Sequence, residues 1–182
     1  MKISYAASFG VSEIPSDAQN DYRKGLNNLD NISVREAEGV KLVKELTGRN
    51  AGHVLDPTLL LDKHEWNSVA VSPEIKKPYL LIYVLTNSKY ATQLAKVIAA
   101  DMGLALIRIC KYSMQQDTDT SIQNIIDAGP AEFVGLFLNA SFIITNSFHG
   151  TAFSVNFGKP FYTVLSKHKS NNSRQINLLN SL

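Results

Sequence analysis

The sequence predicts an α/β protein that has a Rossmann-like parallel sheet domain and an incomplete amino-terminal α/β unit. Short apolar runs typical of buried strands alternate with helical segments, which favours parallel strands joined by crossover helices. The alternation is most regular after residue 78, whereas the earlier part holds too few strands for an independent doubly wound domain. We therefore expect a partial amino-terminal unit at 1–71 and a Rossmann-like domain at 72–182.

The first unit is expected to begin with a strand and to continue as strand, helix, strand and helix. Ser16 or Asp17 is a candidate cap for the first helix, and Gly48 is expected to end the second. One more short strand is expected in 51–55, followed by a turn at Asp56 and Pro57 and a short helix capped by Asp62. The predicted strands and helices lie at 2–7, 17–29, 31–35, 36–46 and 62–69.

The second unit follows a polar, proline-containing linker at 71–78. Ser88 is expected to cap its first helix, and Pro130 suits the first position of its second. The segment 122–126 has no clear pattern. Strands are predicted at 79–85, 104–110, 142–145 and 160–165, and helices at 88–103, 130–139, 147–157 and 174–182.

Composition limits the classes of function. The 182 residues are 45% hydrophobic and 19% charged, and the formal net charge is +2. This balanced charge gives no reason to expect nucleic acid as a partner. No apolar stretch approaches the ~18–20 residues needed to span a membrane, and the first residues read as a strand rather than a signal peptide. We therefore expect a cytoplasmic protein without a membrane span.

Metal and disulfide chemistry are also not expected. Cys110 is the single cysteine, so neither an internal disulfide nor a cysteine-based zinc site can form. It lies in an apolar run and is predicted to be a core residue. The four histidines lack the close paired spacing of a zinc helix. We expect no metal and no cofactor.

The segment that carries the strongest functional signal joins the strand at 142–145 to the following helix. Its residues are Asn146, Ser147, Phe148, His149 and Gly150. A helix start directs backbone N–H groups and a partial positive charge at one spot, which makes it an anion site. His149 would place a titratable group beside the anion, and Gly150 would allow close approach. The alternative is that Asn146 or Ser147 simply caps the helix and that His149 is structural.

A basic loop follows the next strand. It contains Lys167, His168 and Lys169 and leads to Arg174. Ligands of Rossmann-like sheets bind outside the carboxyl ends of the strands. If the two strands are neighbours, this loop and the helix start at Asn146 would face the same crevice. The alternative is a solvated run of surface charge.

Four stretches, in this order along the chain, resemble the polysaccharide pyruvyl transferase family. The longest is 140–161, with the sequence ITNSFHGTAFS at its centre and GKPF at its end. The others are ISVRE at 32–36, VLDPTLL at 54–60, and NSR at 172–174 leading into Leu178 and Leu179. The resemblance covers nearly the whole chain, and the ordered set is more specific than any single motif.

The resemblance implies a GT-B-like fold of two Rossmann-like halves. It also implies a transferase that moves a pyruvyl (carboxyvinyl) group from phosphoenolpyruvate to a saccharide acceptor in cell-surface polysaccharide, or exopolysaccharide, biosynthesis. Members usually begin with a further amino-terminal stretch, which agrees with the incomplete first unit. Whether the chain forms a homo-oligomer stays open.

Phosphoenolpyruvate needs cations and N–H donors around its phosphate and carboxylate. Arginine suits both groups, so Arg35 and Arg174 are candidate ligands, and Arg35 could alternatively pair with Glu36 or Glu38. Some relatives carry arginine and leucine where this chain has Ser147 and Phe148, so Arg174, Lys167 or Lys169 would supply that cation. His149 is the candidate catalytic acid or base.

Two other functions stay open at this point. A helix start that binds a phosphate serves a diphosphate equally well, which fits a GT-B nucleotide-sugar glycosyltransferase or epimerase. A truncated fragment without activity is the second alternative. Binding of a nucleotide sugar without phosphoenolpyruvate would favour the former, and obligate self-association the latter.

Overall fold

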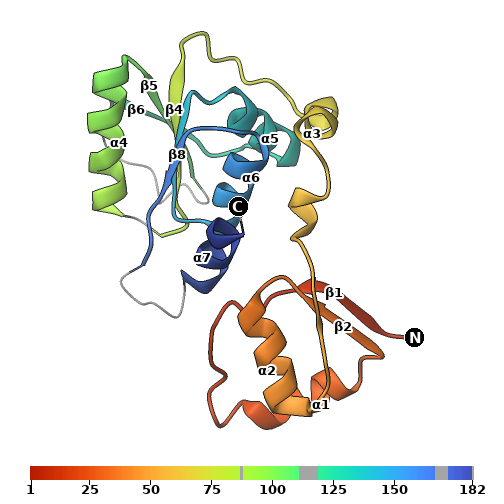
Figure 1. Cartoon of the computed structure of the whole chain (residues 1–182). Coiled ribbons are helices and arrows are strands. Elements are labelled where there is room, and N and C mark those ends of the chain that lie inside the picture. Colours follow the sequence, from red (N-terminus) through yellow and green to blue (C-terminus); the bar gives the residue numbers. More distant parts are fainter. Residues whose placement is uncertain (87, 111–118, 167–171, 182) are drawn as a thin grey trace. The chain divides into compact units, whose positions relative to one another are not determined.

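The computed structural model describes residues 1–86, 88–110, 119–166 and 172–181 (Figure 1). It has an α/β fold with parallel sheets, and the chain divides into two compact units. The first unit contains Met1–Leu60 and Ser166–Leu182, and the second contains Leu61–Leu165. The sequence-based division at 71/72 differs in two places, because it put the helix at 62–69 in the first unit and the last helix in the second.

The first unit has a three-stranded parallel sheet in the order β1-β2-β3. Ile32 and Val34 of β2 are buried against Val43 of α2, which forms one core cluster of this unit. The carboxyl-terminal helix α7 joins the same unit, where the Asn177 side chain donates to Glu38 of α2 at 2.5 Å. The elements are β1 (Ile3–Ala7), α1 (Gln19–Asn27), β2 (Asn31–Val34), α2 (Ala37–Thr47), β3 (Gly52–His53), the 3₁₀ helix η1 (Pro57–Leu59) and α7 (Ser173–Asn180).

The second unit is a Rossmann-like, five-stranded parallel sheet in the order β6-β5-β4-β7-β8. The central strand β4 pairs with β5 on one side and β7 on the other. Its elements are α3 (Lys63–Val69), β4 (Tyr79–Tyr83), α4 (Lys89–Met102), β5 (Ala105–Ile109), β6 (Ile122–Ile125), α5 (Pro130–Asn139), β7 (Phe142–Thr145), α6 (Phe148–Asn156) and β8 (Phe161–Thr163).

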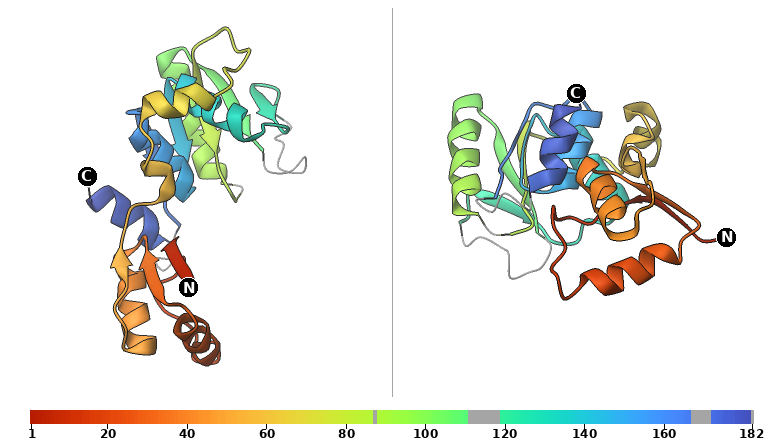
Figure 2. Two further views of the ribbon diagram at one scale, coloured as in Figure 1. Left: turned by 90° about the vertical axis from the view of Figure 1, so that its right-hand side faces the viewer. Right: turned by 60° about the horizontal axis from the view of Figure 1, so that its bottom comes forward.

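Helices cover both faces of the second sheet, with α4 on one side and α5 and α6 on the other (Figures 1 and 2). The stripe of Ala91, Ala95 and Ala99 on α4 lets this helix approach the sheet closely. Large side chains fill the opposite face, where Phe137 of α5 and Phe153 of α6 pack together. Successive apolar side chains of a strand point to opposite faces of the sheet, so a strand such as β4 contributes to two separate cores.

Several local signals in the sequence are confirmed. Gly48 and Gly103 end α2 and α4 in the left-handed conformation. The Ser88 side chain accepts from the N–H of Ala91 at the start of α4, and Asp62 forms a capping box with Glu65 at the start of α3. Cys110 is buried, as expected of a core residue, although it lies just past β5.

Two expectations were wrong. The segment 122–126 holds the strand β6, which was missed because Gln123 and Asn124 interrupt its apolar pattern and because, among the described strands, it lies at the edge of the sheet beside β5. Helix α1 begins at Gln19 without a side-chain cap from Ser16 or Asp17. A turn comes first, because the Pro15 carbonyl accepts from the N–H groups of Ala18 and Gln19.

Candidate functional site

The order of strands places a topological switch point in the second sheet between β4 and β7. From β4 the chain passes through α4 to β5 and β6 on one side, whereas β7 and β8 lie on the other. Ligands of open α/β sheets bind outside the carboxyl ends of the strands at such a point. Two helices begin here, α4 after Ser88 and α6 after Ser147. The predicted anion site thus occupies the position that the topology favours.

The turn between β7 and α6, residues 145–150, holds its shape through Thr145. The Thr145 hydroxyl donates to the carbonyl of Tyr83 on β4 at 2.7 Å and accepts from the N–H of Ser147 at 3.0 Å. Ser147 is the N-cap residue, yet its side chain makes no capping hydrogen bond. The N–H groups in the first turn of α6 therefore do not donate to the side chain of the cap residue, which is compatible with anion binding at this helix start.

Gly150 is required by packing. A Cβ atom at this position would lie 2.2 Å from Oγ1 of Thr145 and 2.9 Å from its Cβ. No side chain fits at that distance without displacing the threonine that shapes the turn. The neighbour that approaches Gly150 closely is thus a side chain of β7.

Asn146 connects the two loops at the switch point. Its Oδ1 accepts from the N–H of Leu85 at 2.7 Å, and its Nδ2 donates to Oγ1 of Thr86 at 3.2 Å. The loop after β4 and the turn after β7 are thereby held together. The Asn146 side chain therefore has a structural role, and its role in binding an anion stays a prediction.

The side chains of the turn differ sharply in exposure. Ser147 and Phe148 are buried, whereas His149 is exposed. The rings of Phe148 and His149 lie edge to face with their centroids 5.4 Å apart. Ser147, Phe148 and Gly150 can therefore contribute mainly backbone groups to a ligand, and His149 is the member of this turn that presents a chemically active side chain.

Of the basic loop, the structure describes the two ends, Ser166 and Asn172, whereas Lys167 and Lys169 lie outside the described residues. The buried side chain of Asn172 accepts from the N–H of Ser166 at 2.9 Å and donates to its carbonyl at 2.8 Å. These two bonds tie the ends of the loop together. Arg174 follows on α7 in the first unit, with its Cζ 3.9 Å from where a Cβ on Gly10 would lie.

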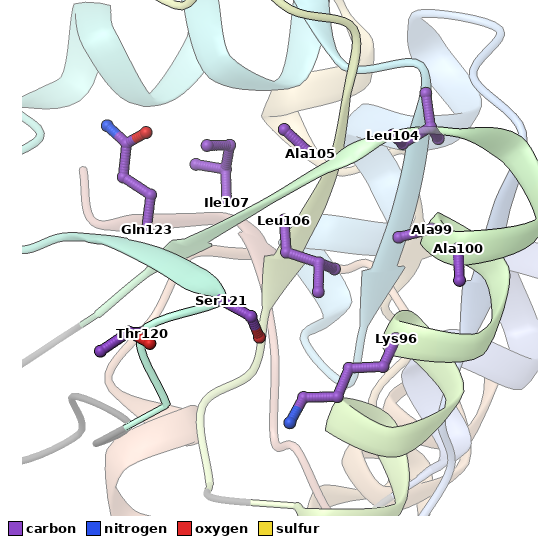
Figure 3. A pocket seen from close by; sticks show the side chains of 10 residues that line it. All are labelled: Lys96, Ala99, Ala100, Leu104, Ala105, Leu106, Ile107, Thr120, Ser121 and Gln123. Carbon is purple, nitrogen blue, oxygen red and sulfur yellow. The ribbon is translucent and has the colours of Figure 1, made fainter.

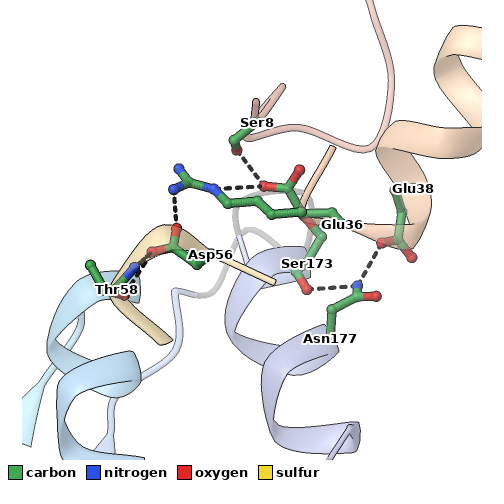
Figure 4. Close-up of polar contacts among 8 residues, drawn as sticks. Ser8, Glu36, Glu38, Asp56, Thr58, Ser173 and Asn177 are labelled. Atoms are coloured by element: carbon green, nitrogen blue, oxygen red, sulfur yellow. Dashed lines mark hydrogen bonds and ion pairs between the residues drawn. The ribbon is translucent and has the colours of Figure 1, made fainter. Parts of the chain in front are cut away.

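Sequence reasoning missed a polar network in the first unit, at the carboxyl edge of its sheet (Figure 4). We call Ser8, Arg35, Glu36, Asp56 and Thr58 the first-sheet edge. The guanidinium of Arg35 pairs with Asp56 and lies 3.7 Å from Oε1 of Glu36, and this oxygen also accepts from the Ser8 hydroxyl. The ion pair of Arg35 with Glu36, one of the alternatives left open, is therefore present, and its predicted contact with a substrate is untested.

Asp56 is the most strongly held carboxylate of this edge. It is 3% exposed, and its Oδ1 accepts from the backbone N–H of Thr58 at 2.9 Å and from the Thr58 hydroxyl at 2.6 Å. Burial alone would raise the pKa of Asp56, but these hydrogen bonds and the charge of Arg35 lower it below the ordinary value. The sequence signal that could have identified Asp56 as a hydrogen-bonded carboxylate is the Asp-Pro-Thr motif, which is typical of the N-cap of a helical turn.

A shallow hollow lies against the α4 face of the second sheet (Figure 3). It is found at the amino ends of β5 and β6, away from the edge where such sheets bind ligands. Lys96 of α4 pairs there with Asp119, and its hydrogen bond holds the pKa of that carboxyl well below the usual range. The hollow is lined by Lys96, Ala99, Ala100, Leu104, Ala105, Leu106, Ile107, Thr120, Ser121 and Gln123.

Two other kinds of site are absent from the part of the chain that the structure describes. No three histidine, cysteine, aspartate or glutamate side chains there are grouped closely enough to hold a metal ion. None of the helices in that part combines the length and the apolar character needed to cross a membrane. Among the described residues, the β7–α6 turn and the first-sheet edge lie at the carboxyl edges of the two parallel sheets, where such folds bind ligands.

The fold of the chain is similar to that of a solved structure, the UDP-GlcNAc 2-epimerase of Methanocaldococcus jannaschii in complex with UDP-GlcNAc and UDP. The TM-score is 0.53 at 15% sequence identity, and the match covers 82% of this chain and 49% of the epimerase. The chain thus spans about half the length of that protein. This likeness and the parallel sheets define a GT-B-like protein of the Rossmann type.

The comparison with sequence families is more specific. A model of the family described as Polysaccharide pyruvyl transferase matches residues 2–168. The chain belongs to the polysaccharide pyruvyl transferase family, which confirms the resemblance seen in its motifs. None of the curated proteins matches the chain.

Proposed function

We propose that the protein transfers a pyruvyl (carboxyvinyl) group from phosphoenolpyruvate to a hydroxyl group of a saccharide acceptor, and that the β7–α6 turn binds the donor. The observation that carries the proposal is an exposed histidine in the first turn of a helix that begins at the switch point. Family membership supports a transferase that acts on polysaccharide.

Donor binding would use the backbone before any side chain. The N–H groups and partial positive charge at the start of α6 would stabilise the phosphate of phosphoenolpyruvate. Lys167 and Lys169 are proposed to add positive charge from the loop whose ends Asn172 holds together. Arg35 and Arg174 remain the candidates for the donor carboxylate, because a guanidinium can bond both of its oxygens at once.

The proposed reaction needs three proton transfers. A proton delivered to the methylene carbon of the donor leaves a cationic centre at C2, and a sugar hydroxyl adds there and loses its proton. Departure of phosphate, which takes the bonding electron pair, makes C2 cationic again, and a second hydroxyl of the same sugar adds to C2 and loses its proton to close a ketal. His149 is the proposed acid or base, because an imidazole can exchange a proton near neutral pH.

The proposal sets the protein in cell-surface polysaccharide, or exopolysaccharide, biosynthesis. Its donor is a cytoplasmic metabolite, so we place the reaction in the cytoplasm. Phosphoenolpyruvate carries the group to be transferred, and no metal or other cofactor is invoked. A homo-oligomer is compatible with this activity but is not needed for it.

A second candidate function is favoured by the likeness to an enzyme crystallised with UDP-GlcNAc and UDP. The start of α6 would serve a diphosphate as well as a phosphate. In that case the chain would act as a nucleotide-sugar glycosyltransferase or epimerase. The two functions differ in whether the chain binds phosphoenolpyruvate or UDP, which one experiment can decide.

Calorimetric titration with phosphoenolpyruvate, and separately with UDP, tests the proposal. We expect wild-type protein to bind phosphoenolpyruvate, and His149→Ala and Arg174→Ala each to weaken binding about tenfold through loss of a charge-assisted contact. His64→Ala is the matched control, since His64 is an exposed histidine on α3 of the same unit as His149. Binding of UDP alone would support the second function. A folded chain that binds neither compound would point to a truncated, inactive fragment.

A further inference from the structure

Helix α4 packs one side against the second sheet and turns the other side outward (Figures 1 and 2). Its buried residues are Ala91, Thr92, Ala95 and Ala99. With 3.6 residues per turn, six of its exposed residues fall within an arc of about 120° on the opposite side. They are Lys89, Tyr90, Gln93, Val97, Ala100 and Asp101. We call these residues the outer face of α4.

The middle of the outer face carries no charge. Tyr90 is 66% exposed and Val97 is 68% exposed, and the neighbouring exposed residues are Gln93 and Ala100. The outward side of a surface helix is normally charged or polar. Helix α2 follows this rule with the exposed residues Lys41, Lys44 and Glu45. The outer face of α4 is thus better suited to a contact that excludes water than to full exposure.

The two ends of the outer face carry opposite charges, and each charge lies at the unfavourable end of its own helix. Lys89 is the first residue of α4, where the helix dipole is positive, and Asp101 lies in the last turn, where it is negative. Among the residues that the structure describes, neither forms an ion pair, whereas Lys96 on the flank of α4 pairs with Asp119. Both charges would gain from a partner that brings the opposite charge.

The positions of the outer face are symmetric about Ala95. Positions 89 and 101, 90 and 100, and 93 and 97 are equally far from it along the chain. Two antiparallel copies of α4, related by a two-fold axis at Ala95, would therefore place exposed positions opposite exposed positions. Lys89 would face Asp101 of the partner subunit, so each charge meets the opposite charge and the favourable end of a helix dipole. An interface between identical subunits needs such self-complementarity.

The uncharged positions fit the same arrangement. The ring of Tyr90 would pack over Ala100 of the partner subunit, where a large side chain meets a small one. Val97 would contact the aliphatic part of Gln93 of the partner subunit. The arrangement buries apolar surface at the centre and leaves the charges at the rim, as in other protein interfaces.

We propose that the protein forms a homodimer through antiparallel packing of the outer faces of two α4 helices. A single pair of 14-residue helices offers less area than the ~1,200–2,000 Å² of stable interfaces, so the dissociation constant should lie above about 1 μM. The inference does not depend on the proposed reaction, because no residue of the outer face is assigned to donor or acceptor.

Sedimentation analysis of the whole 20.1 kDa chain, between about 10 μM and about 1 mM, tests the proposal. Wild-type protein should shift from the monomer towards twice that mass as its concentration rises. Val97→Glu should weaken association at least about tenfold, because it places a charge in the uncharged middle of the interface. Val69→Glu is the matched control, since Val69 is an exposed valine on α3 of the same unit, and it should associate like wild type.

Charge reversal tests the antiparallel pairing itself, at low ionic strength. Lys89→Asp and Asp101→Lys each place like charges opposite one another in a homodimer, so each variant should associate about tenfold more weakly than wild type. Both should fold, because each new charge suits the dipole of its own helix. A mixture of the two variants has opposite charges at both ends and should associate within about threefold of wild type.

Three results would overturn the proposal. The first is wild-type protein that stays monomeric up to about 1 mM. The second is Val97→Glu protein that associates as wild type does. The third is a mixture of Lys89→Asp and Asp101→Lys that associates no better than either variant alone.

Discussion

The carboxyl edges of the two sheets of this protein carry charge in different ways. At the β7–α6 turn of the second unit, the positive potential comes from backbone N–H groups, and the buried side chain of Thr145 shapes the turn. At the first-sheet edge the charges are side chains, with Arg35 held between Glu36 and Asp56. A site of the first kind fails when its packing changes, whereas a site of the second kind fails when one charge is removed.

The largest effect is expected from Gly150→Ala in the second unit. The added Cβ would lie 2.2 Å from Oγ1 of Thr145, so the threonine must move and lose its bond to Tyr83. We expect a loss of about 4 kcal/mol from overpacking and the lost hydrogen bond together. The single tryptophan, Trp66, packs on Phe153 of this unit, so urea unfolding followed by its fluorescence measures the loss.

Gly25→Ala is the matched control in the first unit. No atom lies within 4 Å of the Cβ that it would add, and Gly25 is inside α1. Alanine is favoured over glycine inside a helix by about 1 kcal/mol, so this variant should be neutral or more stable. Amide hydrogen exchange measures the first unit, which lacks tryptophan, and equal losses in both variants would contradict the view that Gly150 is required by its contact with Thr145.

The second largest effect is expected from Asp56→Asn in the first unit. Removing one charge from a buried pair leaves Arg35 without its closest carboxylate, which should cost about 3 kcal/mol. Amide hydrogen exchange in α2 reports on this unit, which lacks tryptophan. Asp21→Asn on the exposed side of α1 is a control that should change little.

The same residue gives the first unit a defined pH dependence. The folded-state pKa of Asp56 is lowered, so its contribution to stability is present above its unfolded pKa, about 3.9, and is lost as pH falls through the folded value. Wild-type protein should lose protection of α2 as pH falls below about 4. In Asp56→Asn this part of the dependence should be absent, and an unchanged pH profile would contradict it.

The difference between the units also explains what the sequence could predict. The second sheet was predicted for four of its five strands, because strands buried on both faces read as continuous apolar runs such as Tyr79–Tyr83. Local rules identified the caps at Ser88 and Asp62 and the start of α6 after Ser147. Strand β6 was missed because an edge strand with two polar residues lacks this pattern.

Contacts between distant residues could not be predicted. The pair of Arg35 and Asp56 joins loops 21 residues apart, and the bond of Ser8 to Glu36 spans 28 residues. Membership of α7 in the first unit depends on contacts such as that of Asn177 with Glu38, 139 residues away. No periodicity or cap signal carries this information, so the first-sheet edge became visible only in the structure.

A third, smaller effect is expected from Asn172→Ala, which removes both bonds to Ser166. The loss should be about 2 kcal/mol, because two hydrogen bonds of a buried side chain are removed. The ends of the loop that carries Lys167 and Lys169 would no longer be held together, so phosphoenolpyruvate binding should weaken as well. Unchanged donor binding in a measurably destabilised variant would remove these two lysines from the proposed donor site.

The smallest effect on stability is expected from Asn146→Asp, and it tests the backbone-based site most directly. The carboxylate can still accept from the N–H of Leu85, and a negative charge next to the start of α6 is favourable, so stability should change by less than about 0.5 kcal/mol. The same charge would repel phosphoenolpyruvate, and calorimetry should show binding weakened at least about tenfold.

Asn146→Ala separates charge from hydrogen bonding in this test. It loses the bonds to Leu85 and Thr86 without adding a charge, so it should lower stability by about 1 kcal/mol and weaken donor binding less than Asn146→Asp does. Added salt should narrow the gap between the two variants, because screening weakens repulsion between charges. If both variants bind the donor equally, the phosphate does not lie at the start of α6. In that case the start of α6 does not bind the donor, and the donor site would have to be sought at the arginines of the first unit.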